Sequence, residues 1–173
     1  MTYDEVVDLS AAAELVKQGA RTGVLEQLTC LSAPVIKRLI RDITGSSPRS
    51  GQLAYSTNWY EERRERLVHS SLFLRIFRRK SAHPEKPRST VFLDSYALYM
   101  NIVDLLPTSW QNHKLDVNRA FLASRLFAIG EFVWRHCEQC HSKYISVNTA
   151  LPQHCHSCHL ITGHWGTSGR RPH

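Results

Sequence analysis

Hydrophobic positions recur with helical spacing along most of the chain. In residues 4–17 the apolar side chains follow a mostly helical period, and Gly19 is placed to end that helix. A short second helix is indicated over 22–28, and a third runs from a Ser32 cap to Ile43. The pattern therefore predicts three amphipathic helices at the start of the chain.

The second and third of these helices are joined by the tight turn TCLS, which gives the outline of a helix-turn-helix. A compact helical bundle would show the same pattern, so both interpretations stay open. Lys37, Arg38 and Arg41 crowd the face of the third helix that the apolar stripe leaves free. We therefore expect this face to contact DNA, and the alternative is that its arginines form surface ion pairs.

A loop and three further helices follow. The stretch TGSSPRSGQL groups Gly, Pro and Ser around Arg49, which is typical of a loop. Behind it the apolar spacing predicts helices over 59–80, 91–106 and 117–136, separated by a polar loop and by Pro107. We expect their aromatic side chains in the core or a subunit interface rather than stacked on bases. These are Tyr96, Tyr99, Phe121, Phe127, Phe132 and Trp134.

Composition and charge narrow the class of protein. The chain has 173 residues and 42% hydrophobic content, enough for one main core with a small appended module. It has acidic residues near its start and no run of about 18 apolar residues, which predicts a cytoplasmic protein with no membrane partner. Its formal net charge of +7 favours a polyanionic partner, although an ordinary basic surface would give the same total.

Two cysteine pairs near the C-terminus carry the clearest chemistry. CEQC spans Cys137 and Cys140, and CHSC spans Cys155 and Cys158 after a gap of fourteen residues. Each Cys-x-x-Cys turn places two sulfurs on one side of a metal, so the spacing predicts one structural Zn²⁺ per chain. Four protein ligands leave no position open for a substrate. A neighbouring histidine could replace one cysteine: His136, His141, His154, His156 or His159.

Other chemistries fit the sequence less well. A thioredoxin-like redox pair lacks its strand and helix context, and here two pairs occur together. His136 and Glu138 form the H-x-E of zinc deaminases, but Pro152 is not adjacent to Cys155 and the first cysteine pair would have no role. No phosphate loop, nucleophile elbow or carboxylate pair is evident, so we predict that the chain is not an enzyme. The fifth cysteine, Cys30, is expected in the core.

The chain resembles the FlhC family, a subunit of the flagellar master transcription activator. The resemblance runs almost end to end, through LVKQGAR, IKRLIRDI, GSSPRSGQLAYSTNWY, HSSLF, SYALYM, RAFLASRLF and the two cysteine pairs. It implies a largely helical protein that holds zinc and binds promoter DNA together with FlhD-like subunits, four of them to two of this kind. RNA polymerase is the further partner that such an activator implies.

Some positions depart from the family pattern. Ser47, Arg49 and Ala54 stand where prolines are usual, and His141 and Ser142 replace a Gly-Gly after the first cysteine pair. Relatives of the family also activate conjugative transfer, so flagellar and conjugative-transfer operons both remain candidate targets.

Together these features predict a mainly α fold, a helical bundle with a helix-turn-helix-like N-terminal region and a small C-terminal zinc ribbon with four cysteine ligands. We expect a helical DNA-binding and oligomerisation domain over 1–136, the ribbon over 137–160 and a flexible tail over 161–173. The predicted function is DNA binding within a hetero-oligomeric transcription activator, and a zinc-ribbon RNA-binding or scaffold protein is the alternative. The candidate DNA contacts are Lys37, Arg38, Arg41, Arg49, Ser56, Asn58, Arg75, Arg78, Arg79 and Lys80.

Overall fold

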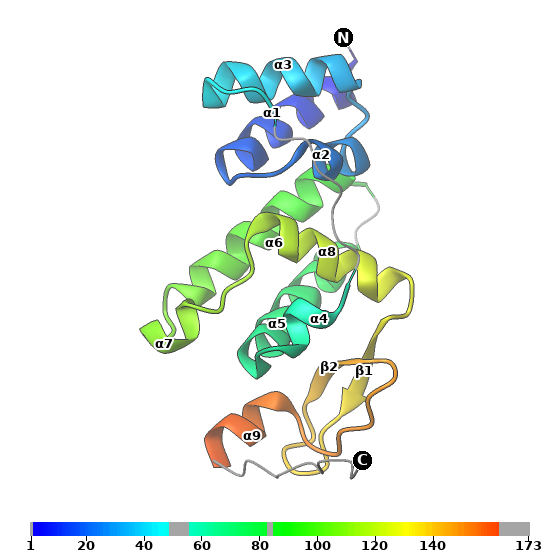
Figure 1. Cartoon of the computed structure of the whole chain (residues 1–173). Coiled ribbons are helices and arrows are strands. Elements are labelled where there is room, and N and C mark those ends of the chain that lie inside the picture. Colours follow the sequence, from blue (N-terminus) through cyan, green and yellow to red (C-terminus); the bar gives the residue numbers. More distant parts are fainter. Residues whose placement is uncertain (1, 49–55, 83–84, 163–173) are drawn as a thin grey trace, which may run out of the picture.

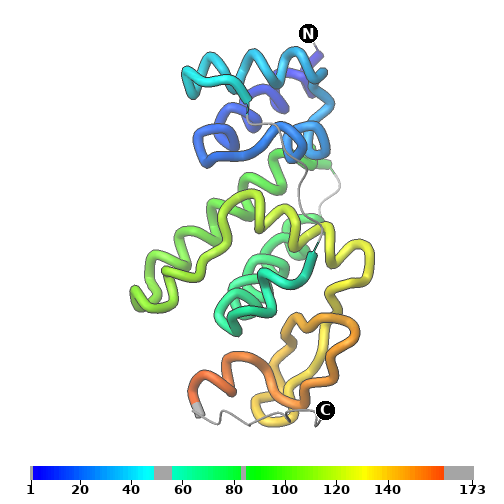
Figure 2. Tube along the Cα trace, viewed as in Figure 1, coloured from blue at the N-terminus to red at the C-terminus, as the bar shows by residue number. Residues whose placement is uncertain are grey.

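The computed structural model describes residues 2–48, 56–82 and 85–162. The fold is mainly helical, with a two-stranded sheet near the C-terminal end, as the sequence predicts (Figure 1). The molecule is elongated, with the N-terminal helices at one end and the sheet at the other (Figure 2). In these described stretches no helix combines the length and the apolar character needed to cross a membrane.

The N-terminal end consists of α1 (Tyr3–Lys17), α2 (Thr22–Leu28) and α3 (Ala33–Thr44). Thr2 and Glu5 form a reciprocal capping box at the start of α1. Gly45 follows α3 with φ +67°, a left-handed conformation that glycine adopts at little cost. The three predicted helices are confirmed, with α2, a tight turn and α3 in the order of a helix-turn-helix.

The middle of the molecule contains α4 (Asn58–Glu61), α5 (Arg64–Lys80), α6 (Arg88–Val103), α7 (Thr108–Gln111) and α8 (Val117–Ala128). The single helix expected over 59–80 is wrong, because the extended backbone of Arg63 separates α4 from α5. Tertiary contacts account for this break. The Tyr60 side chain is fully buried and donates a hydrogen bond to the Arg119 carbonyl at 2.6 Å, which fixes α4 against α8.

The helix expected over 117–136 is also wrong in its second half. After α8 the chain turns at Gly130, with φ +81°, and forms β1 (Phe132–His136), which pairs antiparallel with β2 (Lys143–Val147). The apolar run FVW fits both the helical and the strand period, and its pairing with β2 makes it a strand. A short helix, α9 (His156–Thr162), follows the second cysteine pair.

One hydrophobic core extends from α1 to β2 and is rich in aromatic rings. Phe73 packs edge-on against Phe92 and Tyr99, with ring centroids 5.7 and 5.8 Å apart. The predicted core role of the aromatic residues is confirmed, with Phe127 and Trp134 partly buried against the core. The expectation for Cys30 is wrong, because this cysteine is exposed at the turn between α2 and α3.

Two polar side chains connect the helical segments. The buried Asp8 carboxylate of α1 accepts hydrogen bonds from the Ser89 hydroxyl of α6 and from the Cys30 N–H, the latter at 2.7 Å. Asn118 of α8 accepts from the Arg21 N–H at 2.9 Å and donates to the Gly19 carbonyl at 3.0 Å. The turns on either side of α2 are therefore held by side chains that are distant in sequence.

A buried histidine, His69 of α5, ties together the middle helices. Its Nδ1 lies 2.9 Å from the Tyr99 hydroxyl and its Nε2 lies 3.0 Å from the Trp110 carbonyl. The carbonyl can only accept, so Nε2 carries the proton and Nδ1 accepts from Tyr99. Burial lowers the pKa of His69, which keeps the ring neutral in the fold.

Candidate metal centre and DNA-binding surface

The four paired cysteines meet at one point at the C-terminal end of the molecule. Their four Sγ atoms all lie within 4.8 Å of one another. Cys137 Sγ lies 3.9 Å from Cys158 Sγ, and Cys140 Sγ lies 3.6 Å from Cys155 Sγ. A tetrahedral zinc site with bonds of about 2.3 Å requires sulfurs about 3.8 Å apart. The cluster could therefore hold a metal ion, and its donor set and dimensions fit zinc.

Backbone amides at the first cysteine turn favour the thiolate form that a metal needs. Cys137 Sγ accepts from the N–H groups of Cys155 at 3.2 Å and Cys140 at 3.5 Å. Burial alone would raise the pKa of Cys137, but these N–H groups outweigh it and lower the pKa to about 5. The first cysteine turn is therefore shaped to present sulfur as a ligand. In the second turn, burial raises the pKa of Cys155, and the neighbouring thiol of Cys140 raises that of Cys158.

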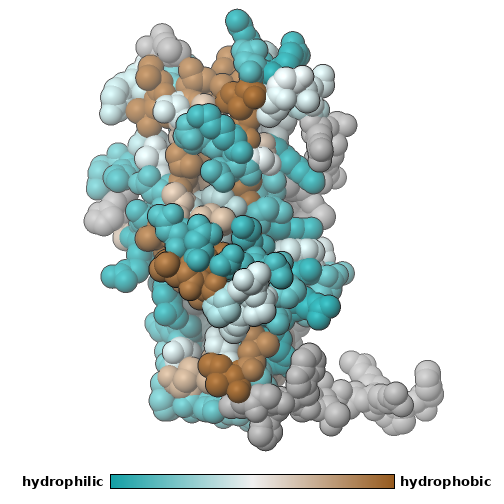
Figure 3. Space-filling view, turned by 90° about the vertical axis from the view of Figure 1, so that its left-hand side faces the viewer, coloured by the Kyte–Doolittle hydropathy of each residue, from teal (hydrophilic) through white to brown (hydrophobic). Residues whose placement is uncertain are grey.

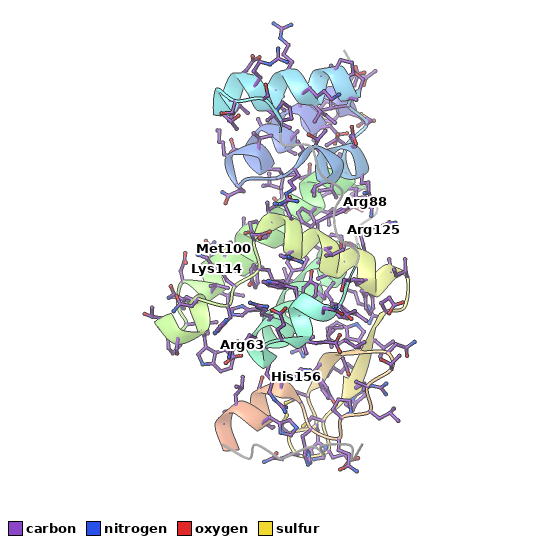
Figure 4. The ribbon with its side chains drawn as sticks, in the orientation of Figure 1. Arg63, Arg88, Met100, Lys114, Arg125 and His156 are labelled. Carbon is purple, nitrogen blue, oxygen red and sulfur yellow. The ribbon has the colours of Figure 1, made fainter. Side chains whose placement is uncertain are left out.

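The residues around the cluster are held by their own hydrogen bonds. Tyr144 of β2 is buried and donates its hydroxyl to the Pro152 carbonyl at 2.6 Å. His156 is the first residue of α9 (Figure 4), and its Nε2 lies 3.1 Å from the Ile145 carbonyl of β2. Burial lowers the pKa of His156 to about 4, so the neutral ring donates to that carbonyl. Within the described residues the metal-binding group consists of cysteines alone.

His141 directly follows the first cysteine pair and has φ +56°, the left-handed region that favours glycine. Its N–H donates to the Cys137 carbonyl at 2.9 Å, which closes the turn that carries the two sulfurs. His141 therefore places a side chain where the backbone disfavours one.

The predicted DNA-contact residues of α3 lie at the opposite end of the molecule (Figure 1). Ile36 and Ile40 are buried on one side of α3, whereas Lys37, Arg38 and Arg41 are exposed. Arg38 lies 3.6 Å from Asp42, but both side chains are largely exposed and such a pair contributes little. The ion-pair alternative thus applies within the described residues to Arg38 alone of these three.

The loop after α3 is described only in part. Arg49 lies outside the described residues. Ser56 is half-buried and its hydroxyl accepts from the N–H of Asn58, which is exposed at the start of α4.

Two cation–π contacts that the sequence did not predict lie beside this end of the loop. The guanidinium of Arg66 lies 4.1 Å from the Trp59 ring centroid, and that of Arg119 lies 4.6 Å away. This stacking fixes the point where the loop enters α4. Adjacent Trp and Tyr at the end of a glycine-rich loop are the only sequence signal for it.

The remaining candidates lie on α5. Arg75, Arg78 and Arg79 are exposed and Lys80 is half-buried. The first three line a hollow together with Trp134 of β1 and Ser142 and Lys143 before and within β2. They therefore lie beside the β1–β2 hairpin next to the cysteine cluster, which we call the metal hairpin. The α3 residues form a separate basic surface.

The chain is similar in sequence to known proteins over most of its length. A family model described as "Flagellar transcriptional activator (FlhC)" matches residues 2–166. The chain is 31% identical over 156 residues to the flagellar transcriptional regulator FlhC of Paraburkholderia atlantica, covering 90% of this chain and 70% of that protein. It is 28% identical to the Gallionella capsiferriformans regulator of the same name, covering 90% and 85%. With the Erwinia tasmaniensis regulator the identity is 30%, covering 90% and 86%.

Proposed function

Since this chain belongs to the FlhC family of flagellar transcriptional activators, we propose that it is the DNA-binding subunit of a hetero-oligomeric bacterial activator. The family consists of transcriptional regulators and not of enzymes. The observation that carries the proposal is the free basic face of α3. That face follows the tight turn after α2 and is presented at the end of the molecule.

In this proposal α3 approaches the major groove in the manner of a recognition helix. Arg38 and Arg41 contact phosphates, and Lys37 adds charge on the same face. The loop after α3, with Arg49, Ser56 and Asn58, supplies base contacts. Asp8 supports this placement because it holds the Cys30 N–H in the turn that precedes α3.

The metal in this proposal is a structural zinc. Cys137, Cys140, Cys155 and Cys158 supply four thiolates, so no coordination position stays open for chemistry. The ion stabilises a hairpin whose own core is small.

FlhD-like subunits and RNA polymerase are the proposed protein partners, in the four-to-two assembly that the family resemblance implies. Apolar surface on one side of the molecule supports a protein interface (Figure 3). Leu105, between α6 and α7, is 85% exposed, and Ile161 of α9 is 80% exposed. The proposed targets are flagellar operons, with conjugative-transfer operons as the second possibility.

The test is a salt titration of DNA binding by the Arg38→Gln/Arg41→Gln variant, with a labelled duplex of about three helical turns. Removing two phosphate contacts should lower the slope of log affinity against log salt concentration by about 1.8. The matched control is Arg63→Gln/Lys114→Gln, which removes the same charge from exposed positions elsewhere (Figure 4). Equal affinity and slope in the two variants would refute the α3 surface. Preference for an RNA hairpin over the duplex would favour the RNA-binding alternative.

A further inference from the structure

A groove runs between α5 and the metal hairpin. One hollow of about 490 Å³ is lined by residues of α5, β1 and the start of β2, and a second of about 230 Å³ continues toward the cysteine cluster. The two hollows share Arg75, Ser142 and Lys143, so they adjoin each other. One wall is a helix and the other is the segment that directly follows the first cysteine pair.

The larger hollow has a one-sided charge. Arg75, Arg78 and Arg79 line it from α5 and Lys143 lines it from the hairpin, and no described carboxylate lines it. In the part of the chain that the structure describes, none of these four cations forms an ion pair with a carboxylate. Four cations on two walls, with no described acidic side chain lining the hollow, attract an anion into it.

The two walls are fixed to each other and to the metal-binding turn. The Arg75 guanidinium donates to the Lys143 carbonyl at 2.7 Å, which joins the helix to the hairpin. The neighbouring Ser142 carbonyl accepts from the Cys137 N–H at 3.0 Å. Because Cys137 belongs to the metal cluster, the wall that carries Lys143 is positioned by the same turn that presents the sulfurs.

We propose that this groove, formed by Arg75, Arg78, Arg79, Lys143 and Trp134, binds the sugar–phosphate backbone of the DNA duplex, as a second contact separate from α3. Arg75 and Arg79 are one helical turn apart, about 6 Å along α5. Two cations at that spacing can contact neighbouring phosphates of one strand. Lys143 supplies the charge on the opposite wall, and the Trp134 ring supplies apolar surface for the sugars.

The inference rests on the proposed DNA-binding function and adds residues of the hairpin to it. Lys143 and Trp134 come from the metal-binding end, for which the sequence predicts only a structural role. An acidic polypeptide could engage the same cations, so the experiment must compare the two polyanions.

The experiment uses the full-length, zinc-loaded chain in its native assembly, with Arg79→Gln/Lys143→Gln as the groove variant. Arg75 is left intact because its hydrogen bond to the hairpin has a structural role. Arg63→Gln/Lys114→Gln again provides the control with equal loss of charge. Binding to a labelled duplex and to poly-glutamate is measured by fluorescence anisotropy across a salt series, and zinc content is checked for each variant.

We expect the groove variant to keep its zinc and to bind the duplex on the order of tenfold more weakly at about 0.1 M salt, with a slope lower by about 1.8. The control should stay near wild type. Duplex binding equal to that of the control overturns the proposal. Loss of poly-glutamate binding with unchanged duplex binding also overturns it, and assigns the groove to an acidic protein.

The Arg38→Gln/Arg41→Gln variant separates this inference from the proposed function. If that variant loses DNA affinity and the groove variant does not, DNA binding stands and the groove proposal fails. If neither variant differs from its control, the proposed function itself fails.

Discussion

Replacing Asp8 with Asn should destabilise the fold and disturb the helix-turn-helix, although Asp8 is not itself a proposed DNA contact. The Asp8 side chain is buried, with residue exposure of 6%, and its two oxygens accept from different elements. Asparagine retains one acceptor oxygen and turns an NH₂ group toward the other donor. Either the Ser89 hydroxyl or the Cys30 N–H would then lose its acceptor.

The magnitude follows from the two hydrogen bonds. A hydrogen bond to a charged group contributes about 1.5–3 kcal/mol, so losing one of them and weakening the other should cost about 2–4 kcal/mol. In a chain of this size each kcal/mol shifts Tm by about 2–4 °C, which predicts a fall of roughly 4–16 °C. Ser89 is fully buried, so water cannot easily replace the missing partner.

The effect should depend on pH in a defined direction. Burial alone would raise the pKa of Asp8, but the hydrogen bonds from Ser89 and Cys30 outweigh it and hold the pKa below 3.8. A lowered folded-state pKa stabilises the protein above pH 3.8, and this contribution is lost as the pH falls through the folded-state pKa. The difference between wild type and Asp8→Asn should therefore be constant at neutral pH and shrink in acid.

Thermal unfolding followed by circular dichroism measures this difference, with Asp4→Asn, an exposed carboxylate in the first turn of the same helix, as the matched control. A double-mutant cycle with Ser89→Ala should show coupling of at least about 0.5 kcal/mol. Equal Tm values for Asp8→Asn and Asp4→Asn would refute the reasoning. DNA affinity should also fall in Asp8→Asn alone, because the turn before α3 loses its anchor.

Three further changes test the metal end and the core. Cys155→Ser should lose the metal and unfold the hairpin, because metal binding supplies folding energy, and a full zinc complement by elemental analysis would contradict this. His141→Gly should raise the free energy of unfolding by up to about 1 kcal/mol, since glycine removes the penalty of the left-handed backbone; a lower Tm would show that the side chain has a compensating contact. Wild-type stability should fall as the pH drops below 6.5, because burial lowers the pKa of His69 and the unfolded chain takes up the proton first. This loss of stability in acid should be smaller in His69→Gln. Urea unfolding at about pH 7.5 and about pH 5.5, on either side of the ordinary histidine pKa, measures it. An identical loss in the variant would exclude His69 as its source.

The N-terminal helices and the metal cluster were predictable because their signals are local. Gly45 and the cysteine pairs each specify their own turn, so α3 and the sulfur cluster follow from short stretches of sequence. Strand β1 was not predictable, because Phe132 and Trp134 fit a continuing helix until β2 pairs with them.

The long-range side-chain hydrogen bonds were equally unpredictable from the sequence. Asp8 meets Ser89 across 81 positions of sequence, and Arg75 meets the Lys143 carbonyl across 68. Neither partner of these pairs carries a local signal, since an aspartate in an amphipathic helix and an arginine on its surface are ordinary. Only the packing of α1 against α6, and of α5 against β2, brings these groups together.

The separation of α3 from the metal hairpin, at opposite ends of an elongated body, has a consequence for the geometry of a promoter. If both surfaces engage one duplex, the distance between them becomes a fixed spacing in base pairs. Because the duplex turns once in about 10.5 bp, inserting about 5 bp between the two contacted segments would rotate one segment to the far side of the helix. Binding should then weaken, and it should recover when a full turn is inserted if the DNA or the assembly can accommodate the added length. The distance between the two protein surfaces would thus set the helical phase between the two DNA segments that they contact.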